Sequence, residues 1–172
     1  GLVNYVTYQP TFENSFQVRQ QLAEYDTYRT DVHANWNALP GTLGLRLDAS
    51  YQNNESFIDH VEGERVFLAP SMLWQLGPDT TLSVRAEYAN GENSAEPGTP
   101  LAGGRPMANV PYDRYFGEPG ETELDHESFR GVATLDHRWN EAHRTRLSLH
   151  GNTAQTDGAY FILFNFSGPP NN

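Results

Sequence analysis

Four residues in one long polar stretch have side chains suited to holding a small ligand. Tyr112, Arg114, Tyr115 and Phe116 lie close together between residues 89 and 127. Aromatic faces can stack on a ligand, and hydroxyl and guanidinium groups can donate hydrogen bonds to it. We therefore predict that these residues bind a ligand by non-covalent contacts. The alternative is that the rings only pack the loop onto the rest of the protein.

An acidic run follows these residues, from Glu118 to Glu127. Carboxylates are ligands that Ca²⁺ accepts, but the run lacks the spacing of an EF-hand loop. The better interpretation is a solvated loop, or one that repels anions, and we predict no metal site.

The residue types needed for covalent catalysis are absent or scattered. The chain has no cysteine, no HExxH, no Gly-x-Ser-x-Gly and no phosphate-binding loop. Its six histidines are dispersed: His33, His60, His126, His137, His143 and His150. We predict that the protein is not an enzyme, has no catalytic residues and needs no cofactor.

The composition excludes some partners. The 172 residues include 22 acidic and 11 basic side chains, a formal charge of −11, which argues against a nucleic-acid footprint. No apolar run approaches the roughly 18–20 residues of a membrane helix. Aromatic residues are nevertheless plentiful, although the mean hydropathy is only −0.65.

Apolar and polar residues alternate strictly along most of the chain, which is typical of β-strands with one apolar and one polar face. In residues 43–51, one parity is Leu, Leu, Leu, Ala and Tyr, and the other is Gly, Arg, Asp and Ser. The pattern predicts about seven strands, each long enough for the roughly 9–11 residues of a tilted membrane strand. They are centred on residues 16–22, 28–37, 43–51, 65–76, 81–88, 130–139 and 145–156.

The predicted connections alternate in length. Those after the second, fourth and sixth strands are short, whereas a tight turn at 24–27, a medium stretch at 52–64 and a long loop at 89–127 lie on the other side. Short turns at one rim and longer loops at the other are typical of outer-membrane barrels.

All three tryptophans end strands that run toward the short turns, on the apolar parity. We predict that Trp36, Trp74 and Trp139 form one aromatic girdle, and that Tyr28, Tyr51 and Tyr88 form a second girdle at the other membrane–water interface. The fold class is therefore an antiparallel transmembrane β-barrel segment of an all-β protein. The alternative is a soluble β-sandwich. Because seven strands leave an open edge in lipid, we expect the chain to be one part of a larger barrel.

Several motifs occur in the order found in one family. Residues 1–10, GLVNYVTYQP, resemble the end of the plug domain of TonB-dependent siderophore receptors of the ferrichrome type, although Tyr8 replaces the usual lysine. The segments YDTYRTDVHANW, SFIDHVEGERVFLAPSMLWQLGPDTTLSVRAEY, YDRYFGEPGETELDHESF and DHRWNEAHRTR are similar to successive barrel segments of that family.

The resemblance implies a 22-stranded multi-pass barrel in the bacterial outer membrane, filled by a plug. Residues 1–12 would end the plug domain, and residues 13–172 would form the N-terminal part of the barrel. The implied function is import of a ferric siderophore, driven by the TonB–ExbB–ExbD complex. Related receptors carry haem, cobalamin or glycans. The alternatives are a soluble β-sandwich carbohydrate-binding module and a passive porin, which needs no plug.

Overall fold

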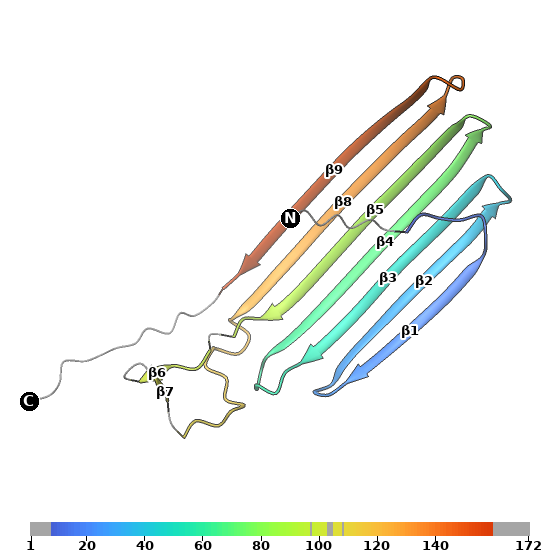
Figure 1. The fold of residues 1–172 in the computed structure, drawn as a ribbon. Helices are drawn as coiled ribbons and strands as arrows, with labels where there is room; N and C mark the ends of the chain where they lie inside the picture. Colours follow the sequence, from blue (N-terminus) through green and yellow to red (C-terminus); the bar gives the residue numbers. More distant parts are fainter. Residues whose placement is uncertain (1–7, 97, 103–104, 108, 160–172) are drawn as a thin grey trace, which may run out of the picture.

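A computed structural model describes residues 8–96, 98–102, 105–107 and 109–159. Seven long strands form one antiparallel sheet in the order β1-β2-β3-β4-β5-β8-β9 (Figure 1). The strands are β1 (Ser15–Ala23), β2 (Thr27–Leu39), β3 (Leu43–Glu55), β4 (Glu62–Gly77), β5 (Thr80–Ser94), β8 (Glu123–Arg138) and β9 (Arg144–Gly158). Two short strands, β6 (Leu101–Ala102) and β7 (Arg105–Pro106), form a separate hairpin in the long loop.

The register of the strands collects the apolar parities on one face of the sheet. Val32 of β2 lies opposite Ala49 of β3, which lies opposite Leu68 of β4. The same row continues through Tyr88 of β5 and Phe129 of β8. Because side chains alternate between faces along each strand, one such row fixes the apolar face throughout the sheet.

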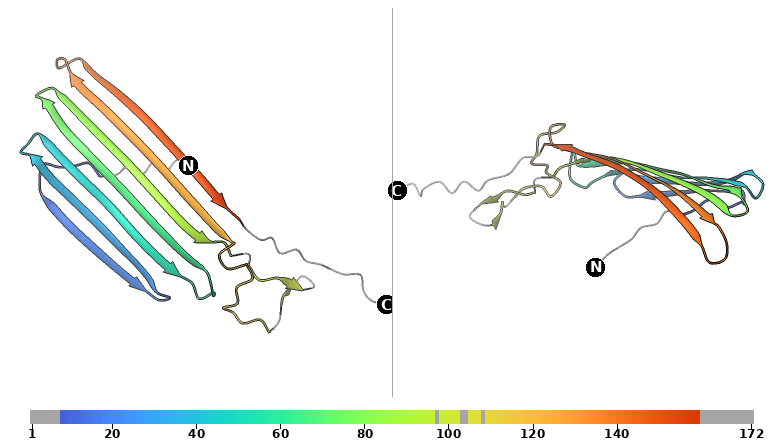
Figure 2. Two further views of the ribbon diagram at one scale, coloured as in Figure 1. Left: turned by 180° about the vertical axis from the view of Figure 1, so that it is seen from behind. Right: turned by 90° about the horizontal axis from the view of Figure 1, so that it is seen from above.

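The sheet is a single curved layer. Figure 2 shows it arched, with the described part of the N-terminal segment on the concave side. Within the described ranges, Ala69 and Tyr115 are the buried apolar residues, and no second sheet covers either face. Trp36 and Leu149 on the apolar face are 62% and 75% exposed. A sandwich would bury such side chains between its sheets, so the β-sandwich alternative is wrong.

The opposite face carries the ion pairs of the strands. Arg46 and Asp48 of β3 are 2.6 Å apart, and His33 of β2 lies 2.6 Å from the same carboxylate. Farther across the sheet, Asp136 of β8 pairs with Arg144 and Arg146 of β9, each at 2.9 Å. A polar concave face and an apolar convex face suit a barrel wall with a polar lumen and a lipid-facing exterior.

The strands extend farther than the sequence pattern predicted. The long loop spans residues 95–122 rather than 89–127, and the medium connection spans 56–61 rather than 52–64. The added strand residues, such as Asn90 and Glu92, are polar on the side that is apolar elsewhere. Alternation therefore ends before the hydrogen-bonded ladder does, and the pattern alone placed the strand ends too early.

No helix in the described ranges is long and apolar enough to cross a membrane. The outer edges of β1 and β9 pair with no other described strand. The predicted domain boundary between residues 12 and 13 stays a prediction, and residues 1–7 lie outside the described residues.

Candidate ligand-binding surface

Three connections meet at one end of the sheet, which we call the long-loop end. They are the turn at 24–26, the connection at 56–61 and the loop at 95–122 (Figure 1). The amide of Asp59 donates to the carbonyl oxygen of Asp113 at 2.8 Å, which ties the second connection to the third. Residues far apart in sequence therefore share one surface.

Three aromatic rings line up across these connections, and we call them the aromatic ladder: Tyr25, Phe57 and Tyr112. The Tyr25 and Phe57 ring centroids are 6.4 Å apart in an edge arrangement, and those of Phe57 and Tyr112 are 6.0 Å apart and stacked. The three residues are 54%, 46% and 79% exposed. The ladder therefore presents aromatic surface to the solvent from three separate connections.

Tyr115 is placed differently from its predicted partner Tyr112. It is only 7% exposed. Its hydroxyl lies 2.7 Å from Oγ1 of Thr122 and donates to the carbonyl oxygen of Ala95 at 3.2 Å. Thr122 in turn donates to the carbonyl oxygen of Glu118 at 2.7 Å. Within the described residues, Tyr115 thus closes the base of the long loop.

A cavity of about 290 Å³ opens beside Tyr115. It is lined by Asp59, His60, Arg114, Tyr115, Gly117, Glu118 and Pro119. Arg114 is exposed, and Phe116 is half-buried. Of the four predicted ligand-binding residues, the structure places Arg114 and Tyr115 at this cavity and Tyr112 on the ladder. No cluster of His, Asp or Glu within the described ranges has the arrangement of a metal site.

The sequence prediction missed Tyr25 and Phe57. Both were visible as aromatic residues in polar connections, but nothing in the sequence pairs a turn at 24–26 with a loop ninety residues away. The pairing depends on the order β1-β2-β3-β4-β5-β8 in the sheet, which brings the three connections to one rim.

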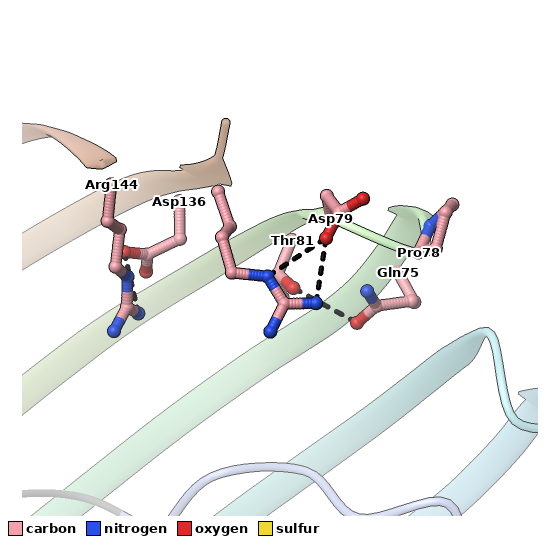
Figure 3. A pocket seen from close by; sticks show the side chains of 7 residues that line it. Gln75, Pro78, Asp79, Thr81, Asp136 and Arg144 are labelled. Atoms are coloured by element: carbon pink, nitrogen blue, oxygen red, sulfur yellow. Dashed lines mark hydrogen bonds and ion pairs between the residues drawn. The ribbon is translucent and has the colours of Figure 1, made fainter. Parts of the chain in front are cut away.

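At the opposite, short-turn end, charged residues line a second cavity of about 270 Å³ (Figure 3). Its residues are Gln75, Pro78, Asp79, Thr81, Asp136, Arg138 and Arg144. Arg138 donates twice to Asp79, at 2.8 and 2.9 Å, and Arg144 donates to Asp136 at 2.9 Å. Each carboxylate in this cavity is paired with a guanidinium, so the lining is polar but carries little net charge.

The segment before β1 is fixed to the polar face through Asn35, which is only 4% exposed. The Asn35 side chain accepts from the amide of Thr11 at 2.9 Å and donates to the carbonyl oxygens of Thr11 and Glu13. Gly44 lies beneath this contact, where an added Cβ would stand 2.8 Å from the Thr11 carbonyl oxygen. The guanidinium of Arg46 lies 5.0 Å from the centre of the Tyr8 ring.

The predicted girdle residues lie on the apolar face. Trp36 is in β2 and Trp74 is in β4, whereas Trp139 directly follows β8 and donates to Oγ1 of Thr145 at 3.0 Å. At the other end of the strands, the Tyr28 and Tyr51 ring centroids are 5.9 Å apart. Their positions suit two interfacial belts, and the belts, including Tyr88, stay a prediction.

No protein-family model matches the chain. It is 33% identical over 159 residues to the metal-pseudopaline receptor CntO of Pseudomonas aeruginosa, a match that covers 92% of this chain and 22% of that receptor. It is also 29% identical over 91 residues to the ferripyoverdine receptor of the same species, covering 52% of this chain and 11% of the receptor. The chain thus spans about a fifth of the length of the receptor CntO.

Solved structures agree on the fold. The pyoverdine outer membrane receptor FpvA from P. aeruginosa superposes with a TM-score of 0.74 at 22% identity, over 88% of this chain and 23% of that one. The siderophore receptor PiuA from Acinetobacter baumannii gives 0.73 at 17% identity, over 88% of this chain and 22% of that one. The chain is therefore homologous to TonB-dependent receptors of the bacterial outer membrane, and its seven strands have the fold of one part of their multi-pass barrel.

Proposed function

We propose that this chain is part of a TonB-dependent outer-membrane receptor that imports a metal ion held by a small organic chelator. The observation that carries the proposal is the 33% identity over 92% of the chain to a metal-pseudopaline receptor. Receptors of this kind transport their ligand without covalent chemistry, so the protein is not an enzyme. The metal complex is cargo rather than a resident cofactor.

The polar concave face supports a receptor over a passive porin. Asn35 hydrogen-bonds to the segment at 10–13, and Gly44 leaves room for it. This segment lies on the lumen side of the wall. A porin has no need of an inner segment that leads into the barrel. We propose that this segment ends a plug domain and that the TonB–ExbB–ExbD complex acts on that plug in the full-length receptor.

We propose a ferric siderophore as the cargo, taken up at the long-loop end. The exposed side chains of Tyr112 and Arg114, with Phe116, offer stacking and hydrogen-bonding groups there, while Tyr115 holds the loop that carries them. A chelate with apolar edges and oxygen acceptors is complementary to such a surface.

Uptake of radioactive iron by cells that express the full-length receptor tests the proposal. Iron is supplied as hydroxamate, catecholate and carboxylate chelates, with and without a functional TonB complex. We expect uptake of at least one chelate, and its loss when the TonB complex is absent or the proton gradient is collapsed. Uptake that continues unchanged without the gradient would favour a porin, and no uptake of any chelate would refute the receptor.

A further inference from the structure

The aromatic ladder is unusual because it is exposed rather than packed. Tyr25, Phe57 and Tyr112 come from three connections. The centroid of the Phe57 ring nevertheless lies 6.4 Å from that of Tyr25 and 6.0 Å from that of Tyr112. Single exposed aromatics are common on proteins, whereas contiguous exposed apolar surface marks a contact site. Phe57 stacks on one face of the Tyr112 ring, yet Tyr112 as a whole is still 79% exposed.

The turn that carries the first ring has a strained backbone. Tyr25 and Asp26 have φ values of 57° and 46°, a left-handed conformation that favours Gly or Asn in such hairpin turns. The chain places a bulky tyrosine there instead. Held strain of this kind occurs where a side chain must be presented in one position, and here the presented ring is the end of the ladder.

The surface around the ladder is strongly acidic. Fourteen of the 22 acidic residues lie in segments 24–26, 52–64 and 89–127, together with only two of the 11 arginines. The rest of the chain has eight acidic residues and nine arginines, so it is almost neutral. The whole formal charge of −11 is therefore concentrated at the long-loop end.

The strand register brings some of these carboxylates into direct opposition on the convex side of the sheet, beyond the end of the apolar band. Glu64 of β4, Glu92 of β5 and Asp125 of β8 are in one row across neighbouring strands. The carboxylate of Glu123, with burial and then Asp125, raises the pKa of Glu92 above its ordinary value. Like charges placed opposite one another cost stability, so the fold maintains a negative surface at a cost.

A field of this sign discriminates between ligands by charge. A negatively charged end of the receptor raises the local concentration of oppositely charged ligands and repels like-charged ones. Exposed aromatic faces add cation–π attraction for a positively charged group. Both effects act in the same direction at the ladder.

We propose that the aromatic ladder is a contact surface for the incoming metal chelate, and that this end of the receptor selects complexes with a neutral or positive net charge over negatively charged ones. This inference rests on the proposed uptake function. It assigns Tyr25 and Phe57 a binding role and defines the charge class of the cargo.

A matched series of three ferric trihydroxamates tests the charge selection in the full-length receptor. Ferrioxamine B ends in a positive amine, its N-acetyl form is neutral and its N-succinyl form ends in a carboxylate, while the iron-binding core is unchanged. Affinity is measured by quenching of intrinsic fluorescence in detergent micelles. We expect affinity to fall in that order, by about tenfold overall at low salt, and the gap to narrow as salt screens the field.

Two outcomes would overturn the inference while leaving the uptake function standing. One is equal or tighter binding of the N-succinyl form. The other is a receptor that takes up iron only from catecholate or carboxylate chelates and binds none of the three trihydroxamates. Failure of the uptake function is separate, because it appears as no uptake of any chelate.

Variants separate the ladder from general effects of mutation. Phe57→Leu combined with Tyr112→Leu removes two rings, and Tyr25→Asn removes the third while keeping a residue that tolerates the left-handed turn. We expect each variant to bind ferrioxamine B at least tenfold more weakly. The control Tyr88→Leu, an aromatic loss on the apolar face, keeps full affinity. Unchanged affinity in the ladder variants would refute the contact role.

Charge variants give an independent readout. Glu118→Gln with Glu121→Gln removes two charges at the long-loop end, and Glu13→Gln with Glu141→Gln removes two elsewhere. We expect only the first pair to shrink the difference in affinity between ferrioxamine B and its N-succinyl form. Equal effects of both pairs would show that net charge, and not its position, governs binding, which contradicts the inference.

Discussion

At the scale of single residues, the structure depends on a few polar side chains that satisfy irregular backbone. Asn35 pairs with both the amide and the carbonyl of Thr11, so a stretch with no strand partner keeps its hydrogen bonds. Tyr115 does the same for the long loop through Thr122 and Ala95. An amide supplies a donor and an acceptor at once, which a carboxylate or an alkyl group does not.

Asn35→Ala should destabilise the junction between the inner segment and the wall. The change removes the hydrogen bonds that the buried Asn35 side chain makes to the amide and carbonyl of Thr11, at a cost of about 1–3 kcal/mol. Urea unfolding of the full-length receptor in lipid vesicles measures this cost. The exposed Asn90→Ala in β5 serves as a control, and an equal loss in both variants would contradict the role of Asn35.

Tyr115→Phe should loosen the long loop without affecting the sheet. The variant loses the hydroxyl contacts with Thr122 and Ala95, which are worth about 1 kcal/mol each. Faster hydrogen exchange confined to residues 95–122 is the expected result. Unchanged exchange in that range, or faster exchange throughout β5 and β8, would refute a local role.

At the scale of the elements, each long strand has one face assigned to lipid and one face assigned to the polar lumen. Val84 and Leu82 of β5 face outward beside Met72 and Trp74 of β4, whereas Ser83 and Arg85 face the concave side. The β-strand period of two residues makes this separation complete, because each successive side chain changes face. A charge should therefore be tolerated at one position and costly at the next.

Val84→Arg should destabilise the protein much more than Ser83→Arg. Val84 lies near the middle of the apolar band, where an arginine facing lipid costs about 2–4 kcal/mol. Ser83→Arg places the same charge on the polar face and is the control. Urea unfolding in vesicles compares the two variants, and similar losses for both would contradict the assignment of the lipid-facing side.

At the scale of the whole molecule, the chain separates its charge from its apolar surface. The middle of the sheet is apolar outside and ion-paired inside, the short-turn end is neutralised, and the negative charge is gathered at the long-loop end. The net negative charge is therefore at the long-loop end, while the wall is nearly neutral.

The charge repulsion at the long-loop end should make stability depend on pH. The carboxylate of Glu123 contributes most to the raised pKa of Glu92, whose ordinary value is 4.5. Since the folded pKa is the higher one, the folded state takes up this proton first. Stability should therefore rise as the pH falls through the raised folded pKa toward 4.5, and this gain is lost as the pH rises again.

Urea unfolding of the full-length receptor across that range measures the gain, and Glu123→Gln should reduce it. Glu141→Gln, on a short turn at the other end, is the matched control. A gain that is the same in Glu123→Gln as in the parent protein would contradict the electrostatic origin.

The strands, their two faces and their membrane-barrel class could be predicted from the sequence. Its period-two alternation and the placement of Trp36, Trp74 and Trp139 are local features, and a strand expresses them wherever it lies. Strand ends were less accessible to prediction because the polar extensions, such as residues 89–94, have no apolar side to reveal them. The close approach of Thr11 to Gly44 also could not be predicted, because no sequence pattern links the two residues.

Which residues come together at the long-loop end could be seen only in the folded sheet. Tyr25, Phe57 and Tyr112 share no sequence pattern, and Tyr115 differs from Tyr112 only in the contacts that the fold gives it. The rings of the aromatic ladder come from residues far apart in the chain, so their contacts depend on the order and register of the strands. Alternation specifies which way each side chain points, whereas the assembled sheet specifies which loops become neighbours.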